Sequence, residues 1–195
     1  MKPETRSGGL ALAAWLEARR DGPIPLASDL GPMKMKDFLP YVGAFRQTDG
    51  GRRVITVHGT ALVEQFGFDA TGRTVEDVFP PDQRDEVRAL HDYMFEHGCL
   101  GHVMREVRNR HGAAIAAEQL LLPLRNDAGT HDRYIWVAER TGKHPQMQSS
   151  SEPRDTILIG RIVRRTLYDA HSLLPVACAF NTERPDADMH EPLEI

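Results

Sequence analysis

The chain has 195 residues, of which 41% are hydrophobic and 27% charged, a balance typical of a globular protein rather than a disordered one. Its 24 basic and 28 acidic residues give a formal net charge of −4, which excludes a protein that binds nucleic acid through bulk positive charge. The last fifteen residues hold five acids and one arginine, so residues 1–180 are formally neutral.

The pattern of cysteines and apolar runs indicates a cytoplasmic protein. Cys99 and Cys178 have no disulfide-framework spacing, which favours a reducing compartment. No run approaches the roughly 20 apolar residues that a membrane span needs. The apolar run at residues 10–16 ends in Glu-Ala-Arg-Arg without a cleavage pattern, so we expect neither a signal peptide nor a membrane partner.

The N-terminal part of the chain is predicted to be helical. Residues 10–21 place Leu12, Trp15 and Leu16 on one face at helical spacing, and Gly-Pro follows as a stop. Residues 33–39 form a second, short helix that Pro40 ends. We expect residues 1–40 to be flanking helices.

In the middle of the chain the spacing of apolar residues changes from that of a helix to that of a strand. Residues 41–47 and 53–58 read as two strands joined at Asp-Gly-Gly, followed by single helical turns near residues 61–66 and 74–79. A longer helix runs from about residue 80 to His97, with Gly98 as its stop. Three further strands are predicted in a meander, at residues 102–108, 114–124 and 133–139.

This order predicts an α+β domain over residues 41–142: a five-stranded antiparallel sheet whose helices are inserted in one place and cover one face. Residues 143–156 have the composition of a linker. Residues 157–195 form a C-terminal extension, in which residues 157–168 fit a helix or a strand equally and the acidic end is expected to be disordered.

Several motifs in this order resemble those of PAS (Per-Arnt-Sim) domains. Residues 59–73, Gly-Thr-Ala-Leu-Val-Glu-Gln-Phe-Gly-Phe-Asp-Ala-Thr-Gly-Arg, are similar to the run that follows the first PAS hairpin. An early Trp15, the Leu39-Pro40 pair and the Leu-rich strand at residues 120–124 resemble a bacterial branch of stand-alone PAS proteins of unassigned function. The resemblance covers residues 10–140 and implies a sensor of small ligands or cofactors that dimerises and binds partners.

The PAS resemblance brings two cofactors into consideration, haem and flavin. Haem-binding PAS domains ligate iron through a histidine of the long helix, where this chain has His91 and His97; the alternative is a histidine hydrogen-bonded within the core or at its rim. Flavin-binding light sensors carry an Asn-Cys-Arg-Phe-type helix, which is absent, and Cys99 follows the long helix. The cofactor is therefore left unassigned.

Metal binding has little support in the sequence. Neither His-Glu-x-x-His nor Cys-x-x-Cys occurs, and Asp186, Asp188 and His190 alternate in an acidic tail that is more simply solvated. No metal site is expected.

Two groups of arginines are candidates for an anion clamp. The groups lie on the third strand and on the C-terminal element, and consist of Arg105, Arg108, Arg110, Arg161, Arg164 and Arg165. The alternative is a solvent-facing charged surface paired with Glu106 and Asp155.

A cavity between the inserted helices and the sheet is expected to hold a small ligand. The side chains expected to line it are Phe66, Phe68, Phe79, Leu90, Met94, Met104, Leu122, Tyr134 and Trp136. The alternative is that all of them are ordinary core residues.

These observations predict a sensory or regulatory PAS protein that binds a small ligand, a protein partner or both, with no output enzyme in the chain. We expect a homodimer formed through the N-terminal helix face that carries Trp15 and Leu12. The alternative is an interaction module with a filled core. An enzyme acting on a small substrate is a third hypothesis, for which His58 and His102 are the first candidates and no catalytic residue is assigned.

Overall fold

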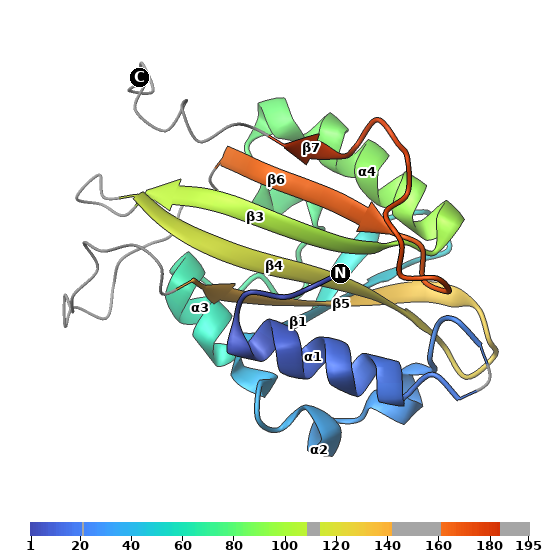
Figure 1. Ribbon diagram of the computed structural model, residues 1–195. Helices are drawn as coiled ribbons and strands as arrows, with labels where there is room; N and C mark the ends of the chain where they lie inside the picture. The colour runs from blue at the N-terminus through green and yellow to red at the C-terminus, as the bar shows by residue number, and fades with distance from the viewer. Residues whose placement is uncertain (21, 109–113, 142–160, 184–195) are drawn as a thin grey trace.

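The structure is a computed structural model that describes residues 1–20, 22–108, 114–141 and 161–183. The predicted linker and the acidic end lie almost wholly outside these described residues. The described chain folds around a single seven-stranded antiparallel sheet, with strand order β2-β1-β5-β4-β3-β6-β7 (Figure 1). The strands are β1 (Val42–Gln47), β2 (Arg53–His58), β3 (Leu100–Arg108), β4 (Ala114–Arg125), β5 (His131–Arg140), β6 (Arg161–Tyr168) and β7 (Thr182–Glu183).

The first five strands are those predicted from the sequence, and the predicted α+β fold is confirmed. The sheet is wider than the five strands expected, because β6 and β7 continue it beyond β3. The element left open between helix and strand is β6. It pairs antiparallel with β3 from Leu100↔Tyr168 to Glu106↔Arg161, with a bulge after Met104.

Between β2 and β3 the chain forms α3 (Thr60–Phe66), α4 (Arg84–His97) and two short 3-10 turns, η3 (Glu76–Val78) and η4 (Pro81–Gln83). Both α-helices end at a glycine in the left-handed region, Gly67 at φ 76° and Gly98 at φ 63°. These elements pack on one face of the sheet, which we call the cavity face.

The opposite face is covered by α1 (Arg6–Glu17), so helices lie on both faces and not on one as expected (Figure 1). The short elements η1 (Ala27–Leu30), α2 (Pro32–Met35) and η2 (Leu39–Tyr41) follow α1 along the chain. We call this side the α1 face. Strand alternation explains why both faces need cover: Leu120, Leu122 and Leu124 pack with α1, while Leu121 packs on the cavity face.

Trp15 shows how α1 is attached. Its side chain is fully buried, and its indole Nε1 donates a 2.7 Å hydrogen bond to the carbonyl oxygen of Pro123 on β4. Leu12 is only 8% exposed. The expectation that these two residues form a dimer surface is therefore wrong, because the apolar stripe of the helix is already buried against the sheet of its own chain.

The N-terminal segment is held by a buried carboxylate on β4. Glu118 accepts hydrogen bonds from the backbone N–H groups of Glu4 and Thr5, both at 2.7 Å, and from the Thr5 hydroxyl at 2.5 Å. Nε2 of His102 lies 2.7 Å from the same carboxylate. Burial alone raises the pKa of Glu118, but the hydrogen bonds from His102, Thr5 and Glu4 outweigh it, so the pKa is lowered overall.

Replacing Trp15 tests whether α1 is part of the core. Trp15→Ala should lower the free energy of unfolding by about 3–5 kcal/mol, because a fully buried indole and its hydrogen bond are lost. Urea denaturation followed by circular dichroism measures the loss. The exposed Met33→Ala is the control and should change stability by less than about 0.5 kcal/mol. An unchanged Trp15→Ala midpoint together with a change of oligomeric state would restore the dimer-surface interpretation.

Replacing Glu118 tests the carboxylate. Its folded pKa lies below its unfolded value, so its contribution is present above about pH 4.3 and is lost as the pH falls through the folded pKa. Glu118→Gln should cost about 2–3 kcal/mol at pH 7, and the difference from the unmodified chain should shrink below about pH 4. Urea denaturation at several pH values measures both. Glu17→Gln, at an exposed position of α1, is the control; an equal loss in both variants would contradict the assignment.

Candidate ligand-binding site

A cavity of about 120 Å³ lies between the cavity face of the sheet and the elements α3, η3, η4 and α4. Its walls come from segments that are far apart in the sequence, including the side chains of Ile55, Val87 and Leu121. Most of the lining is apolar. Polar side chains enter it at separate points, so a bound molecule would meet different chemistry at its two ends.

One end of the cavity is aromatic. The ring centroid of His58 on β2 lies 5.5 Å from that of Phe66, 6.5 Å from Phe68 and 6.1 Å from Trp136. Trp136 fits here because Gly43 pairs with it across β1 and β5, and a Cβ on Gly43 would collide with the indole ring. We call Phe66, Phe68 and Trp136 the aromatic end.

The other end carries two arginines from neighbouring strands. The guanidinium of Arg105 on β3 lies 5.6 Å from the Phe79 ring centroid, and its Nε lies 3.4 Å from Gln119 Oε1. Arg165 on β6 is 5% exposed. It donates through Nε to the Phe180 carbonyl oxygen at 2.5 Å and through an NH2 group to Glu86 Oε1 at 2.9 Å. We call Arg105 and Arg165 the arginine end.

The arginine end brings two guanidinium groups close enough to repel each other. Burial, followed by the nearby charge of Arg165, lowers the pKa of Arg105 to about 10. The group therefore remains charged at neutral pH, at a cost in solvation and repulsion. Glu86 acts in the opposite direction and raises the pKa of Arg105, but its own side chain is 59% exposed.

His91 of α4 lies in the cavity wall. It is 4% exposed and its ring stands edge-on to Phe45 at 5.2 Å. Nδ1 is buried and has no hydrogen-bond partner within the described residues. Burial, with the charges of Arg53, Arg105 and Arg165, lowers the pKa of His91 to about 3, so the imidazole is neutral at pH 7. A buried, unpartnered polar atom carries a free-energy cost that a ligand can remove.

The structure does not favour haem. A neutral, buried His91 has the protonation state that iron ligation needs, but a cavity of about 120 Å³ is far too small for a haem macrocycle. His97, the second histidine considered, is exposed and stacks edge-on against Tyr93 at 4.2 Å outside the cavity. Neither histidine is therefore assigned to a haem.

The structure brings together about half of the residues expected to line the cavity. Phe66, Phe68, Phe79, Leu90, His91 and Trp136 all line it. Met94 and Tyr134 pack in the same layer without lining the cavity. Met94 is fully buried, and the Tyr134 hydroxyl lies within hydrogen-bond distance of the carbonyl oxygens of Met94 and Cys99, at 2.8 and 2.9 Å, which share its one proton.

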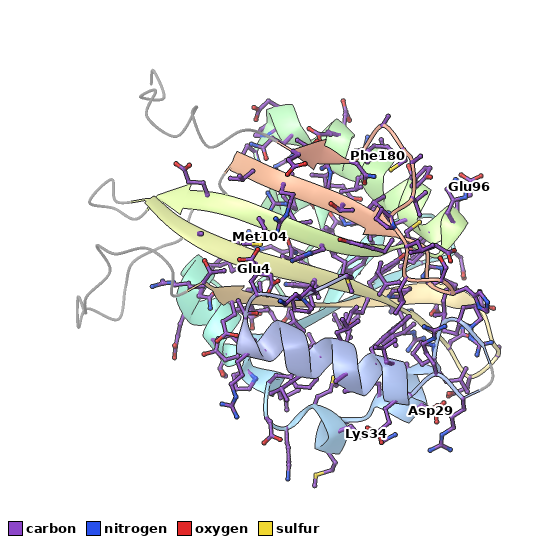
Figure 2. All side chains as sticks on the ribbon, in the orientation of Figure 1. Glu4, Asp29, Lys34, Glu96, Met104 and Phe180 are labelled. Carbon is purple, nitrogen blue, oxygen red and sulfur yellow. The ribbon has the colours of Figure 1, made fainter. Side chains whose placement is uncertain are left out.

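Met104 and Leu122 do not reach the cavity, because they lie on the α1 face. Figure 2 shows Met104 beside Glu4 on the side of the sheet that carries α1. Their strand neighbours Val103 and Leu121 line the cavity instead. A signal for this was present in the expected pairing of β4 with β5: Leu121 lies directly opposite Trp136, and directly opposed residues share a face.

The arginines considered for an anion clamp are divided between the two faces of the sheet. Arg105 and Arg165 reach the cavity, whereas Arg164 bonds Glu4 at 2.8 Å on the α1 face. Arg110 and the side chains of Arg108 and Arg161 lie outside the described residues, as do Asp186, Asp188 and His190.

The two histidines considered for an enzyme share no site. His58 accepts a 3.2 Å hydrogen bond from the backbone N–H of Ala70 through Nδ1, and burial lowers its pKa. His102 bonds Glu118 on the opposite face of the sheet. Within the described part of the chain, no three histidine, cysteine, aspartate or glutamate side chains gather closely enough to hold a metal ion. The helices of this same part include none with the length and apolarity to cross a membrane.

A family model of the PAS domain matches residues 3–137, and the chain therefore belongs to the PAS domain family. Solved structures with a similar fold include the VqmA dimer of Vibrio cholerae, which is 20% identical over 53% of this chain and 48% of that chain, with a TM-score of 0.42. The PAS domain of a Colwellia psychrerythraea protein is 11% identical over 57% of this chain and 97% of that chain, also with a TM-score of 0.42. This chain thus spans about half the length of the VqmA protein that it matches.

A third similar structure is a LOV protein of Rhodobacter sphaeroides, 10% identical over 53% of this chain and 60% of that chain, with a TM-score of 0.37. Among functionally curated proteins, no sequence matches this chain. At these identities the structural similarities concern the fold alone.

The pH dependence of folding tests the burial of His91. Its pKa of about 3 in the folded state lies below the unfolded value of about 6.5, so the unfolded chain takes up a proton that the folded chain refuses. The free energy of unfolding should therefore fall as the pH is lowered from about 6.5, with His91 contributing up to about 1.4 kcal/mol per pH unit.

His91→Leu should flatten this slope between about pH 6.5 and pH 5, as measured by urea denaturation. Gln65→Leu, another change in the cavity wall that removes no titrating group, should keep the slope of the unmodified chain. Equal slopes in all three proteins would show that His91 is accessible to protons in the folded state.

Proposed function

We propose that the chain is a sensory PAS module that binds a small molecule in the cavity between the sheet and the elements α3 and α4. The observation that carries this proposal is Nδ1 of His91, a buried polar atom without a partner in the wall of a largely apolar cavity. A purely structural core of the same shape gains nothing from a neutral histidine at this point, because an apolar residue of similar size would avoid the unmade hydrogen bond.

The size of the cavity limits the ligand. A dry protein cavity of about 150 Å³ is sufficient for benzene. The cavity of about 120 Å³ therefore supports a ligand with one ring or a short branched chain, without movement of its walls. The proposal includes no cofactor, and it assigns the ligand-binding role to Phe66, Phe68, Phe79, Leu90, His91 and Trp136.

β4 provides a route from the cavity to the rest of the molecule. Ala117 and Gln119 line the cavity, and Glu118 between them holds Glu4 and Thr5 on the other face. A ligand that displaces this part of β4 would change the attachment of the N-terminal segment. The route works only if the ligand binds one arrangement more tightly than the other.

The state of the cavity would be passed to a protein partner. Such a partner cannot use the apolar stripe of α1, since Trp15 and Leu12 are buried. The arrangement of the two histidines considered for catalysis gives no support to the enzyme hypothesis, because the sheet separates them.

Native and denaturing mass spectrometry of the full chain purified from its own host test the proposal. The native protein should carry extra mass that denaturation releases. Ala138→Leu narrows the cavity at β5 and should abolish the extra mass, whereas Ala13→Leu at an exposed position of α1 should retain it. Circular dichroism confirms that both variants are folded. Absence of extra mass, with no change in melting temperature against a metabolite panel, would favour the interaction module with a filled core.

A further inference from the structure

We propose that the cavity selects a small organic anion, a monocarboxylate whose apolar body lies at the aromatic end and whose carboxylate lies at the arginine end. This inference rests on the proposed function and deepens it by naming the class of ligand. It is carried by the arrangement of the buried charges and rings along the cavity.

The sheet order separates the two ends. The aromatic end is built from α3 and β5, with His58 of β2 beside it, and the arginine end is built from β3 and β6. Trp136 of β5 lies opposite Leu121 of β4, whereas Arg105 of β3 lies opposite Ala117, so Trp136 and Arg105 are separated by two strand spacings across the sheet and by four residues along it.

The charge of the arginine end favours an anion. The charged side chains among the described lining residues are those of Arg105, Arg165, Glu86 and Glu118. The carboxylate of Glu118 is held by donors of the α1 face, and the Glu86 side chain is 59% exposed. Arg165 is buried and Arg105 is half-buried, and a carboxylate between them would relieve the repulsion that opposes their charges.

A carboxylate matches the donors better than a phosphate does. The guanidinium group is planar, and its paired N–H groups fit the two oxygens of a carboxylate. A phosphate carries more charge and more oxygen atoms, which the enclosed space and two partly engaged arginines do not match. Arg165 donates to Phe180 and Glu86, and Arg105 Nε lies 3.4 Å from Gln119 Oε1, so a bound carboxylate would share both guanidinium groups with protein partners.

His91 completes the site without adding charge. Because its imidazole is neutral, one ring nitrogen is a donor and the other an acceptor, and Nδ1 has no partner within the described residues. A second oxygen of the ligand, or the edge of the carboxylate, can pair with it. A cationic ligand would instead face two arginines, and a purely apolar one would leave the polar groups unmatched.

Isothermal titration calorimetry with the full chain and three probes of similar size tests this inference. The probes are benzoate, benzyl alcohol and benzylamine, which share one ring and differ in the charge of the head. Benzoate should bind at least about tenfold more tightly than benzyl alcohol, because its hydrogen bonds to arginine are charge-assisted. Benzylamine should not bind measurably.

Two variants of Arg105 test whether this residue recognises the charge of the ligand. Arg105→Gln should remove the preference for benzoate over benzyl alcohol, and circular dichroism shows whether the variant is folded. Arg105→Lys should restore part of the preference for benzoate, because lysine keeps the positive charge but lacks the paired N–H groups of a guanidinium. Arg164→Gln is the control, since Arg164 adjoins Arg165 on β6 but bonds Glu4 on the α1 face.

The outcomes separate this inference from the function on which it rests. Equal or tighter binding of benzyl alcohol, or a benzoate preference that survives Arg105→Gln, overturns the anion inference and leaves ligand binding intact. A co-purifying mass that proves to be a neutral or cationic compound does the same. If no probe binds and no mass co-purifies, the proposed function and the inference both fail.

Discussion

The fold depends on one buried carboxylate that accepts hydrogen bonds from four donors. Glu118 sits in the centre of the sheet, and three of the donors come from the first five residues of the chain. A buried acid without these partners would strongly destabilise the protein, so the N-terminal segment and the sheet are stable only together. Once the segment is fixed, Thr5 caps α1 through a 3.1 Å bond from Gly8 N–H, and the helix is placed over Leu120 and Leu122.

This attachment allows one sheet to support two different layers. Alternation along β4 sends Leu120 and Leu122 to the α1 face and Leu121 to the cavity face. The α1 face is closely packed, with Trp15 fully buried. The cavity face is packed around a void and contains buried polar groups. The close packing of the α1 face holds the sheet rigid. The residues around the void on the cavity face are therefore kept in fixed positions, as a binding site requires.

Much of the fold was predictable because local signals agreed with it. The Asp-Gly-Gly turn, the long helix ending at Gly98 and the turns of the meander each have a direct backbone cause. The facing of strands was not predictable in the same way, because a slip of one residue exchanges Met104 with Val103 and Leu122 with Leu121. The position of α1 was missed because an amphipathic helix looks the same whether its stripe meets a partner or its own sheet.

The candidate site was predictable in its aromatic half and less so in its charged half. Phe66, Phe68 and Trp136 stand out as large apolar residues, whereas Arg105 and Arg165 look like surface charges until their strands are placed in the sheet. β6 was the hardest element to predict, because Ile159, Val163 and Leu167 have helical spacing while the Ile, Val and Thr content of the segment fits a strand. Only pairing with β3 decides between them.

Arg165 has a geometric consequence for the end of the described chain. Its guanidinium holds the carbonyl group of Phe180, whose ring lies 5.3 Å from Tyr93 of α4, and Figure 2 shows Phe180 where β7 passes that helix. The same group also holds Glu86 and lines the cavity. Any molecule that draws Arg165 inward must lengthen one of these bonds. Under the proposed function, the position of Phe180 beside α4 is thus mechanically linked to cavity occupancy.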